Sequence, residues 1–194
     1  MIRTFTPTRH RTVAAICGLA FALATSSASL AQDAGTEADA NAAGLPGGAS
    51  SLTETHGDWT VACRLGQQDE QTIRLCALSQ QQSNQQGQRV LAVELRPADD
   101  GAGGVMILPF GLVLAQGVTL RIDESEAGEP LPFSTCLPAG CIVPISFDAA
   151  RIEALSQGTT LAVTATATNG GETNLAISLA GFTSALNRTR ELME

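Results

Sequence analysis

The chain has 194 residues and a net charge of −8, and 44% of its side chains are hydrophobic, 15% charged and 4% aromatic. This composition indicates one globular domain and excludes a disordered polymer, a coiled coil and a multi-pass membrane protein. The basic residues are all Arg, and the acids outnumber them 19 to 11. Nucleic acid is therefore not a predicted partner, because neutralising phosphates requires a concentrated basic face.

The first 31 residues have the three parts of an export signal. A start containing three Arg precedes an apolar stretch over residues 13–24, and Ser29 and Ala31 supply the small residues of a cleavage site. The apolar stretch is too short to span a membrane, so no transmembrane helix is expected once the signal is removed. That removal takes the net charge from −8 to −11. The prediction is a periplasmic protein, or one that is secreted or associated with the outer envelope.

Residues 32–55 are predicted to form a flexible acidic tether. They are mostly Ala, Gly, Ser, Thr, Asp and Glu, with hardly a large apolar side chain. Such a stretch cannot bury enough surface to offset the entropy lost on ordering. Residues 56–194 then remain for the fold, and this length is sufficient for one hydrophobic core.

Four cysteines remain after Cys17 leaves with the signal: Cys63, Cys76, Cys136 and Cys141. An even number of cysteines in an exported chain favours two disulfides. Three pairings are open. The spacing favours Cys136 with Cys141, which flank a Pro and Gly turn, and Cys63 with Cys76, which lie on consecutive predicted strands. A redox pair or a zinc site is less favoured, because the chain lacks the CxxC spacing typical of both.

Short segments with apolar alternation, separated by Gly, Pro and Asn turns, predict an all-β domain. The expected strands cover residues 57–63, 73–82, 89–95, 105–108, 118–123, 131–136, 141–147, 161–168 and 174–179, with a loop over 97–104. Two helices are expected, one capped by Asp148 and ending at Leu155, the other over 182–192. The predicted fold class is an antiparallel β-sandwich or barrel-like domain with one or two short helices, braced by disulfides. Trp59 and Phe182 are expected to be core anchors.

Candidate catalytic groups are few. After removal of the signal the chain has one histidine, His56, and neither Lys nor Tyr. No nucleophile-elbow motif accompanies His56, which we interpret as a solvated loop residue. No catalytic, metal or cofactor site is therefore predicted. A non-catalytic protein is favoured over an enzyme, and thiol–disulfide chemistry at Cys136 and Cys141 is the alternative.

Two polar segments are candidate partner surfaces. The first is the tip of a Gln-rich hairpin, at Asn84, Gln85 and Gln86. The second is an acidic strand connection, at Asp123, Glu124, Glu126 and Glu129. The acidic segment would steer a basic partner by charge. A calcium loop or a pair of catalytic acids is less favoured there than a solvated connection.

Several segments form an ordered pattern: Gly57-Asp58-Trp59 before Cys63, Cys76 on a strand that runs into Gln80, Leu108-Pro109-Phe110-Gly111-Leu112 before Gly117-Val118, Cys136 with Cys141, and Gly181-Phe182 before Ala185-Leu186. Over residues 57–192 this pattern resembles the invasion-associated locus B family of exported alphaproteobacterial proteins. The resemblance implies an envelope-associated β domain, named for a role in entry into red blood cells, with no catalytic residue to carry over. The expected function is a binding or accessory role with a protein partner in the envelope or on a host cell.

Overall fold

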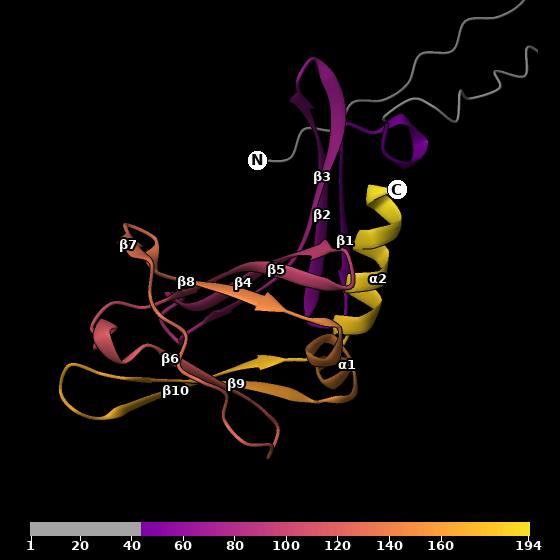
Figure 1. The fold of residues 1–194 in the computed structure, drawn as a ribbon. Coiled ribbons are helices and arrows are strands. Elements are labelled where there is room, and N and C mark those ends of the chain that lie inside the picture. The colour runs from indigo at the N-terminus through magenta and orange to yellow at the C-terminus, as the bar shows by residue number, and fades with distance from the viewer. Residues whose placement is uncertain (1–43) are drawn as a thin grey trace, which may run out of the picture. The chain divides into compact units, whose positions relative to one another are not determined.

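The computed structural model describes residues 44–194, so the predicted export signal and residues 32–43 of the predicted tether lie outside the described residues. The described residues form two antiparallel sheets, two α-helices and two single-turn 3₁₀ helices (Figure 1). Two disulfides brace the larger sheet. The predicted fold class, an antiparallel β domain with two short helices and two disulfides, is confirmed.

The larger sheet has seven strands in the order β1-β2-β3-β4-β5-β8-β7. These strands are β1 (Ser51–His56), β2 (Trp59–Gln68), β3 (Gln71–Ser83), β4 (Arg89–Ala98), β5 (Gly101–Leu108), β7 (Thr135–Leu137) and β8 (Gly140–Phe147). Every neighbouring pair is antiparallel. Short turns therefore suffice to connect β1 through β5, and the chain returns later to add β7 and β8.

The smaller sheet has the order β10-β9-β6. Its strands are β6 (Val118–Ile122), β9 (Thr160–Thr166) and β10 (Glu172–Ser178). The helices are α1 (Ala149–Gln157), α2 (Phe182–Met193), and the 3₁₀ helices η1 (Pro46–Gly48) and η2 (Leu114–Gln116). Helix α1 connects β8 to β9, and α2 follows β10 and packs against β1, β2, β3 and β4 (Figure 1).

The core contains every second residue of the central strands. Val61 pairs with Leu78, and Leu78 with Leu95, and each of these side chains is at most 1% exposed. Directly paired residues share one face of a sheet, so this register aligns an apolar face against α2 and the smaller sheet. Trp59 and Phe182 are each 1% exposed, and their rings meet edge to face with centroids 5.3 Å apart. Both are core residues, as predicted.

The tether prediction is wrong for its last residues. Leu45 is 2% exposed, and Ser51–His56 form β1, which pairs with β2 along its whole length. Sequence reasoning missed this strand because its inward positions hold Leu52, Glu54 and His56, so two of the three are polar and the apolar alternation is lost. The folded unit therefore includes Leu45 and β1 and does not begin at His56.

The loop predicted over 97–104 is also wrong. Strand β4 continues to Ala98 and β5 begins at Gly101, with a two-residue turn between them. A Cβ on Gly104 would collide with the carbonyl oxygen of Glu94, so glycine is required there by the close approach of two strands. The strand predicted at 131–136 is confined to Thr135–Leu137.

Candidate binding surface

The β1–β2 turn and the β10–α2 turn meet at two glycines. Gly57 has φ 59°, and a Cβ on it would lie 2.5 Å from the carbonyl oxygen of Ala180. The Asp58 N–H donates to that same oxygen at 3.0 Å. Gly181 has φ 87°, and a Cβ on it would lie even closer to the carbonyl oxygen of His56. Gly57 and Gly181 both belong to the sequence pattern that resembles the family. In the structure they allow the two turns to approach each other closely, because glycine has no Cβ.

Gln80 belongs to the interior, although it opens the Gln-rich stretch. Its side chain is 7% exposed, donates to the carbonyl oxygen of Ser178 at 2.9 Å and accepts from the Ser178 N–H at 3.0 Å. The Trp59 indole N–H donates to the same Ser178 oxygen at 2.9 Å, and the Gln82 amide donates to the carbonyl oxygen of Ala176. Side chains from the larger sheet thus satisfy the free edge of β10 in place of another strand.

The predicted hairpin tip is partly used by the fold itself. The Asn84 side-chain oxygen accepts from the backbone N–H groups of Gln86 and Gln88, each at 3.0 Å. Asn84 therefore builds the turn, in the manner usual for Asn in turns. The side chains of Gln85 and Gln86 are exposed and remain available to a partner.

In the acidic connection, too, one residue is bound within the fold and the others are exposed. Asp123 accepts from the Thr159 hydroxyl at 2.6 Å and from the Thr160 N–H at 2.8 Å. The Thr159 hydroxyl, with the backbone N–H groups beside it, holds the pKa of Asp123 below its ordinary value. The other three acids are exposed: Glu124, Glu126 and Glu129. Among residues 44–194, no three His, Cys, Asp or Glu side chains are grouped as ligands for a metal ion.

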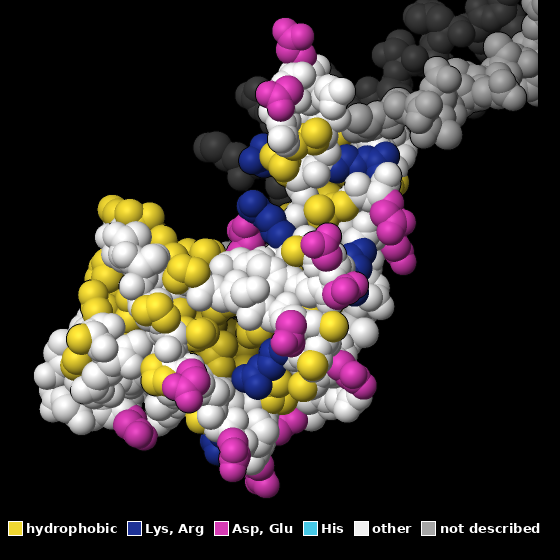
Figure 2. All heavy atoms as spheres, viewed as in Figure 1, with side chains coloured by type: hydrophobic (Ala, Val, Ile, Leu, Met, Phe, Trp, Pro, Cys, Tyr) yellow, Lys and Arg dark blue, Asp and Glu magenta, His cyan; other side chains and the backbone are white. Residues whose placement is uncertain are grey.

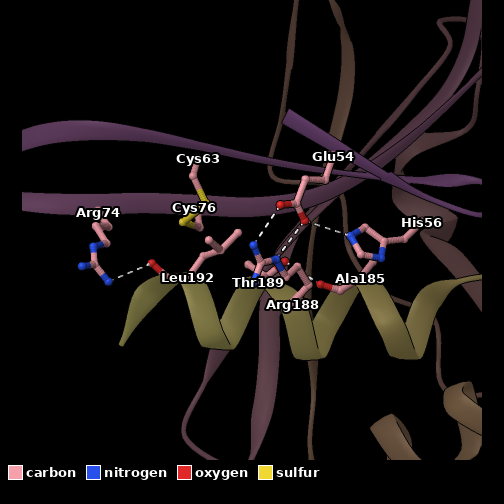
Figure 3. The surroundings of a disulfide bond; sticks show 9 residues. All are labelled: Glu54, His56, Cys63, Arg74, Cys76, Ala185, Arg188, Thr189 and Leu192. Atoms are coloured by element: carbon pink, nitrogen blue, oxygen red, sulfur yellow. Dashed lines mark hydrogen bonds and ion pairs between the residues drawn. A yellow bond between two sulfur atoms is a disulfide. The ribbon is translucent and has the colours of Figure 1, made fainter. Parts of the chain in front are cut away.

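An ion-pair network joins β1 to α2, and sequence reasoning did not find it (Figure 3). Two nitrogens of the Arg188 guanidinium each donate at 2.9 Å to a different carboxylate oxygen of Glu54. This bidentate pairing lowers the pKa of Glu54 and raises that of Arg188. His56 Nε2 lies 3.3 Å from Glu54 Oε2, and its side chain is 21% exposed. The interpretation of His56 as a solvated loop residue is wrong, because it ends β1 beside a carboxylate.

Both disulfides connect residues that are paired directly across neighbouring strands. Cys63 and Cys76 join β2 to β3 with an S–S distance of 2.01 Å, beside Leu192 at the C-terminal end of α2 (Figure 3). Cys136 and Cys141 join β7 to β8 with an S–S distance of 1.96 Å. The pairing favoured from spacing is therefore the one observed. Cys136 is exposed, whereas Cys141 is buried.

A groove of about 690 Å³ lies between β6, the end of β8 and α1. Leu120 and Phe147 contribute to its apolar lining, and Glu129, Asp148 and Arg151 contribute charged groups. Asp148 is already committed as the N-cap of α1, because it accepts from the Arg151 N–H at 2.8 Å. Because two carboxylates and one guanidinium line the groove, it favours neither a cationic nor an anionic ligand.

A group of apolar side chains at the ends of strands and in the segments between them was not predicted from the sequence, and we call it the apolar end. It consists of Pro109, Phe110, Leu114, Phe133, Leu137 and Pro138. Phe110 is 61% exposed, Leu137 50% and Leu114 43%. Figure 2 shows hydrophobic side chains gathered over the region of β7 and β8. Within the described chain, no helix is long and apolar enough to cross a membrane.

Backbone contacts hold two segments of the apolar end in place. A Cβ on Gly140 would lie 2.5 Å from the carbonyl oxygen of Leu108, so the β7–β8 turn lies against the end of β5. The Thr168 N–H donates to Gly111 at 2.8 Å, which ties the segment after β5 to the end of β9. The signal that could have revealed this surface is the absence of charge: residues 101–120 and 130–147 contain no Asp, Glu, Lys or Arg.

The fold defines a class of protein: a disulfide-braced antiparallel β domain whose C-terminal helix is fixed to its first strands. The comparisons identify the family. The profile of the family described as Invasion associated locus B (IalB) protein matches residues 59–190. An invasion protein B homolog of Brucella abortus is 49% identical over 154 residues, which cover 78% of this chain and 86% of that protein. The chain belongs to the invasion-associated locus B family, as the sequence resemblance implied.

Two further relatives come from Bartonella. Invasion protein B of Bartonella bacilliformis is 37% identical over 177 residues, covering 89% of this chain and 93% of that protein. The crystal structure of invasion associated protein B from Bartonella henselae has a TM-score of 0.66 and 36% identity to this chain. The match covers 73% of this chain and 96% of the Bartonella henselae chain. The fold described above is therefore shared with a solved member of the family.

Proposed function

We propose that this protein is an exported, non-catalytic binding protein that attaches through its apolar end to a component of the bacterial envelope or of a host cell. One observation carries the proposal: Phe110, Leu114 and Leu137 are exposed on segments of the chain without a charged residue. Contiguous apolar patches exposed on a soluble domain mark interaction sites. The relatives in Brucella and Bartonella are named for invasion, which supports a role at the boundary between bacterium and host.

The use of the polar residues supports binding over catalysis. His56, the candidate base, contacts the carboxylate of Glu54, which is itself held by Arg188. Asp123, one of the candidate acids, is held by Thr159, the residue before β9. These groups bind one another between elements of the fold, so their positions are explained without a substrate.

A basic protein partner is favoured by the exposed acids of the strand connection. Glu124, Glu126 and Glu129 lie close together in sequence, and the net charge of −11 after removal of the export signal extends the attraction beyond them. Gln85 and Gln86 offer amides to the same partner. Because such steering is screened by salt, association with a basic partner should slow as ionic strength rises.

Thiol–disulfide activity is the second candidate, and the exposure of Cys136 favours it. The assay is reduction of insulin by dithiothreitol, with the native protein compared with a Cys136→Ser/Cys141→Ser variant. The proposal expects equal rates from both proteins. A faster rate with the native protein would assign the activity to this disulfide and displace the binding proposal.

Site-specific photo-crosslinking in intact cells tests the binding surface. A photoreactive amino acid replaces Phe110 in one strain and Met193, which is 42% exposed on α2, in another. We expect an adduct from position 110 and none from position 193. Equal labelling at both positions, or at neither, would remove the apolar end as the binding surface.

Export is tested by mass spectrometry of the protein isolated from its own cell envelope. We expect Gln32 or a nearby residue at the new N-terminus, because the signal-like segment ends at Ala31. A protein that still begins at Met1 would contradict the proposed export and processing.

A further inference from the structure

We propose that the apolar end binds the surface of a lipid bilayer of zwitterionic lipids, with Phe110, Leu114 and Leu137 inserted among the acyl chains and Arg89 at the phosphate groups. This inference rests on the proposed function and names the component to which the protein attaches. It is drawn from the placement of the exposed side chains and from the charges around them.

The three inserted side chains come from separate places in the fold. Phe110 follows the end of β5, Leu114 begins η2, and Leu137 ends β7 at the turn into β8. They are between 43% and 61% exposed, so each has apolar surface to transfer from water. Apolar side chains that reach only the boundary between headgroups and acyl chains are sufficient for reversible membrane binding.

The charge pattern favours lipid over a protein partner at this surface. Residues 101–120, 130–147 and 158–171, which supply the apolar end and the adjoining part of β9, contain no charged residue. A charged side chain placed in hydrocarbon is costly, so a surface that enters lipid must be free of charge. Protein interfaces instead surround an apolar centre with a polar rim.

The guanidinium of Arg89 lies beside the β7–β8 turn of the apolar end. Arg89 is exposed, and its Nη2 donates at 2.8 Å to the carbonyl oxygen of Ala139, next to Pro138 in the β7–β8 turn. Among residues 44–194, no carboxylate lies within 4.0 Å of the Arg89 guanidinium. Its remaining donors can therefore bind a lipid phosphate as Leu137, at the start of the same turn, enters the bilayer.

The net charge selects the lipid. After removal of the export signal the net charge is −11, so the protein is repelled by an anionic membrane surface, and a single Arg cannot offset that repulsion. Zwitterionic lipids present phosphate groups without a net negative surface charge. Phosphatidylcholine and phosphatidylethanolamine vesicles are therefore the expected targets, and added phosphatidylglycerol should not increase binding.

The experiment is flotation of the protein with phosphatidylcholine and phosphatidylethanolamine vesicles. The test variant is Phe110→Ser/Leu114→Ser/Leu137→Ser, and the matched control is Met193→Ser, which removes a fourth exposed apolar side chain on α2. All variants carry the same N-terminal segment, so any contribution from it cancels. We expect the triple variant to lose at least about 10-fold in partitioning and the control to stay within about 2-fold of the native protein.

A second pair of variants tests the phosphate contact. Arg89→Gln should weaken vesicle binding by about 5-fold, whereas Arg64→Gln, an exposed Arg on β2, should change it little. Equal effects of the two substitutions would overturn the role of Arg89. Binding that rises with phosphatidylglycerol would overturn the choice of zwitterionic lipid.

Failure of the inference and failure of the proposed function give different results. If native protein does not float with vesicles but position 110 still crosslinks to a protein in cells, the lipid inference is wrong and the binding function stands. If native protein is a dimer by light scattering and the triple variant a monomer, with no flotation of either, a second copy covers the apolar end and the lipid inference is again overturned. Loss of both crosslinking and flotation would overturn the two together.

Discussion

Two regions of the molecule differ in how their side chains are used. One is the region where α2 packs against the first three strands, and the other is the apolar end. In the first region polar side chains between the elements are paired: Glu54 binds Arg188, Gln80 binds Ser178, and Cys63 is bonded to Cys76. At the apolar end, side chains as large as Phe110 and Leu137 are left in solvent. The first region is organised to hold the fold together, whereas the second leaves apolar surface free for a partner.

This difference separates residues that stabilise the domain from residues that serve binding. A buried aromatic contributes through the surface it removes from water, whereas an exposed one contributes little to the folded state. Substitutions in the two regions should therefore have opposite effects on stability and on attachment. The predictions below begin with the largest expected effect.

The sharpest contrast is between two phenylalanines. Phe182→Ala should lower the free energy of unfolding by about 3–5 kcal/mol, because Phe182 is 1% exposed and packs against Trp59. Phe110→Ala should change it by less than about 0.5 kcal/mol. Urea denaturation followed by far-UV circular dichroism measures both. Similar losses for the two variants would mean that the apolar end is part of the core.

The two disulfides should also differ. In the chain-entropy model, Cys63→Ser/Cys76→Ser should cost about 3 kcal/mol and Cys136→Ser/Cys141→Ser about 2 kcal/mol, because the first bond closes the longer loop. Non-reducing peptide mapping verifies the pairing, and denaturation midpoints measure the losses. Free thiols or crossed pairing in the native protein would contradict the structure directly.

Gln80 should be more important than its exposed neighbour. Gln80→Ala leaves the Ser178 N–H without its acceptor and should cost about 1–3 kcal/mol. Gln81→Ala, on the opposite face of β3, should cost less than about 0.5 kcal/mol. Thermal unfolding of both variants provides the comparison. Equal midpoints would show that the Gln80 amide is not needed at the edge of β10.

The Glu54 ion pair should make a small, pH-dependent contribution. The Arg188 guanidinium holds the pKa of Glu54 below its ordinary value of 4.5, so the folded state binds that proton less readily than the unfolded state. The resulting stability is present above pH 4.5 and is lost as the pH falls through the folded-state pKa. The difference between native protein and Glu54→Gln should therefore be largest near pH 7 and disappear in acid.

The matched control is Glu94→Gln, since Glu94 pairs with Arg96 on an exposed face. That substitution should leave the urea midpoint nearly unchanged both near pH 7 and in acid, because exposed ion pairs contribute little to stability. A Glu54→Gln difference that persists in acid would show that packing of the side chain, and not its charge, connects β1 to α2.

The sequence was sufficient to predict most of the fold, because most strands and both helices follow an apolar period. It failed where polar groups replace that period. Strand β1 was hidden because Glu54 occupies an inward position and finds Arg188 only through the tertiary fold. The start of β5 was hidden because Gly101 and Gly104 are typical of turns, and only the close approach of neighbouring backbones explains them.

The binding surface was harder to predict than the fold. The polar segments that attracted notice in the sequence, around Asn84 and Asp123, turn out to hold turns and strand junctions in part. The apolar end was overlooked because its residues come from separate segments, and an exposed Phe cannot be distinguished from a buried one in a single sequence. The missing charges over residues 101–120 and 130–147 were the available signal.

The most direct test of the central claim is to fractionate cells that carry Phe110→Ser/Leu114→Ser/Leu137→Ser, after establishing that the variant keeps the native unfolding midpoint. The account predicts that the folded variant is lost from the envelope fraction, whereas Met193→Ser is retained there like the native protein. Retention of the folded triple variant at the native level would contradict the claim that the apolar end is the attachment surface.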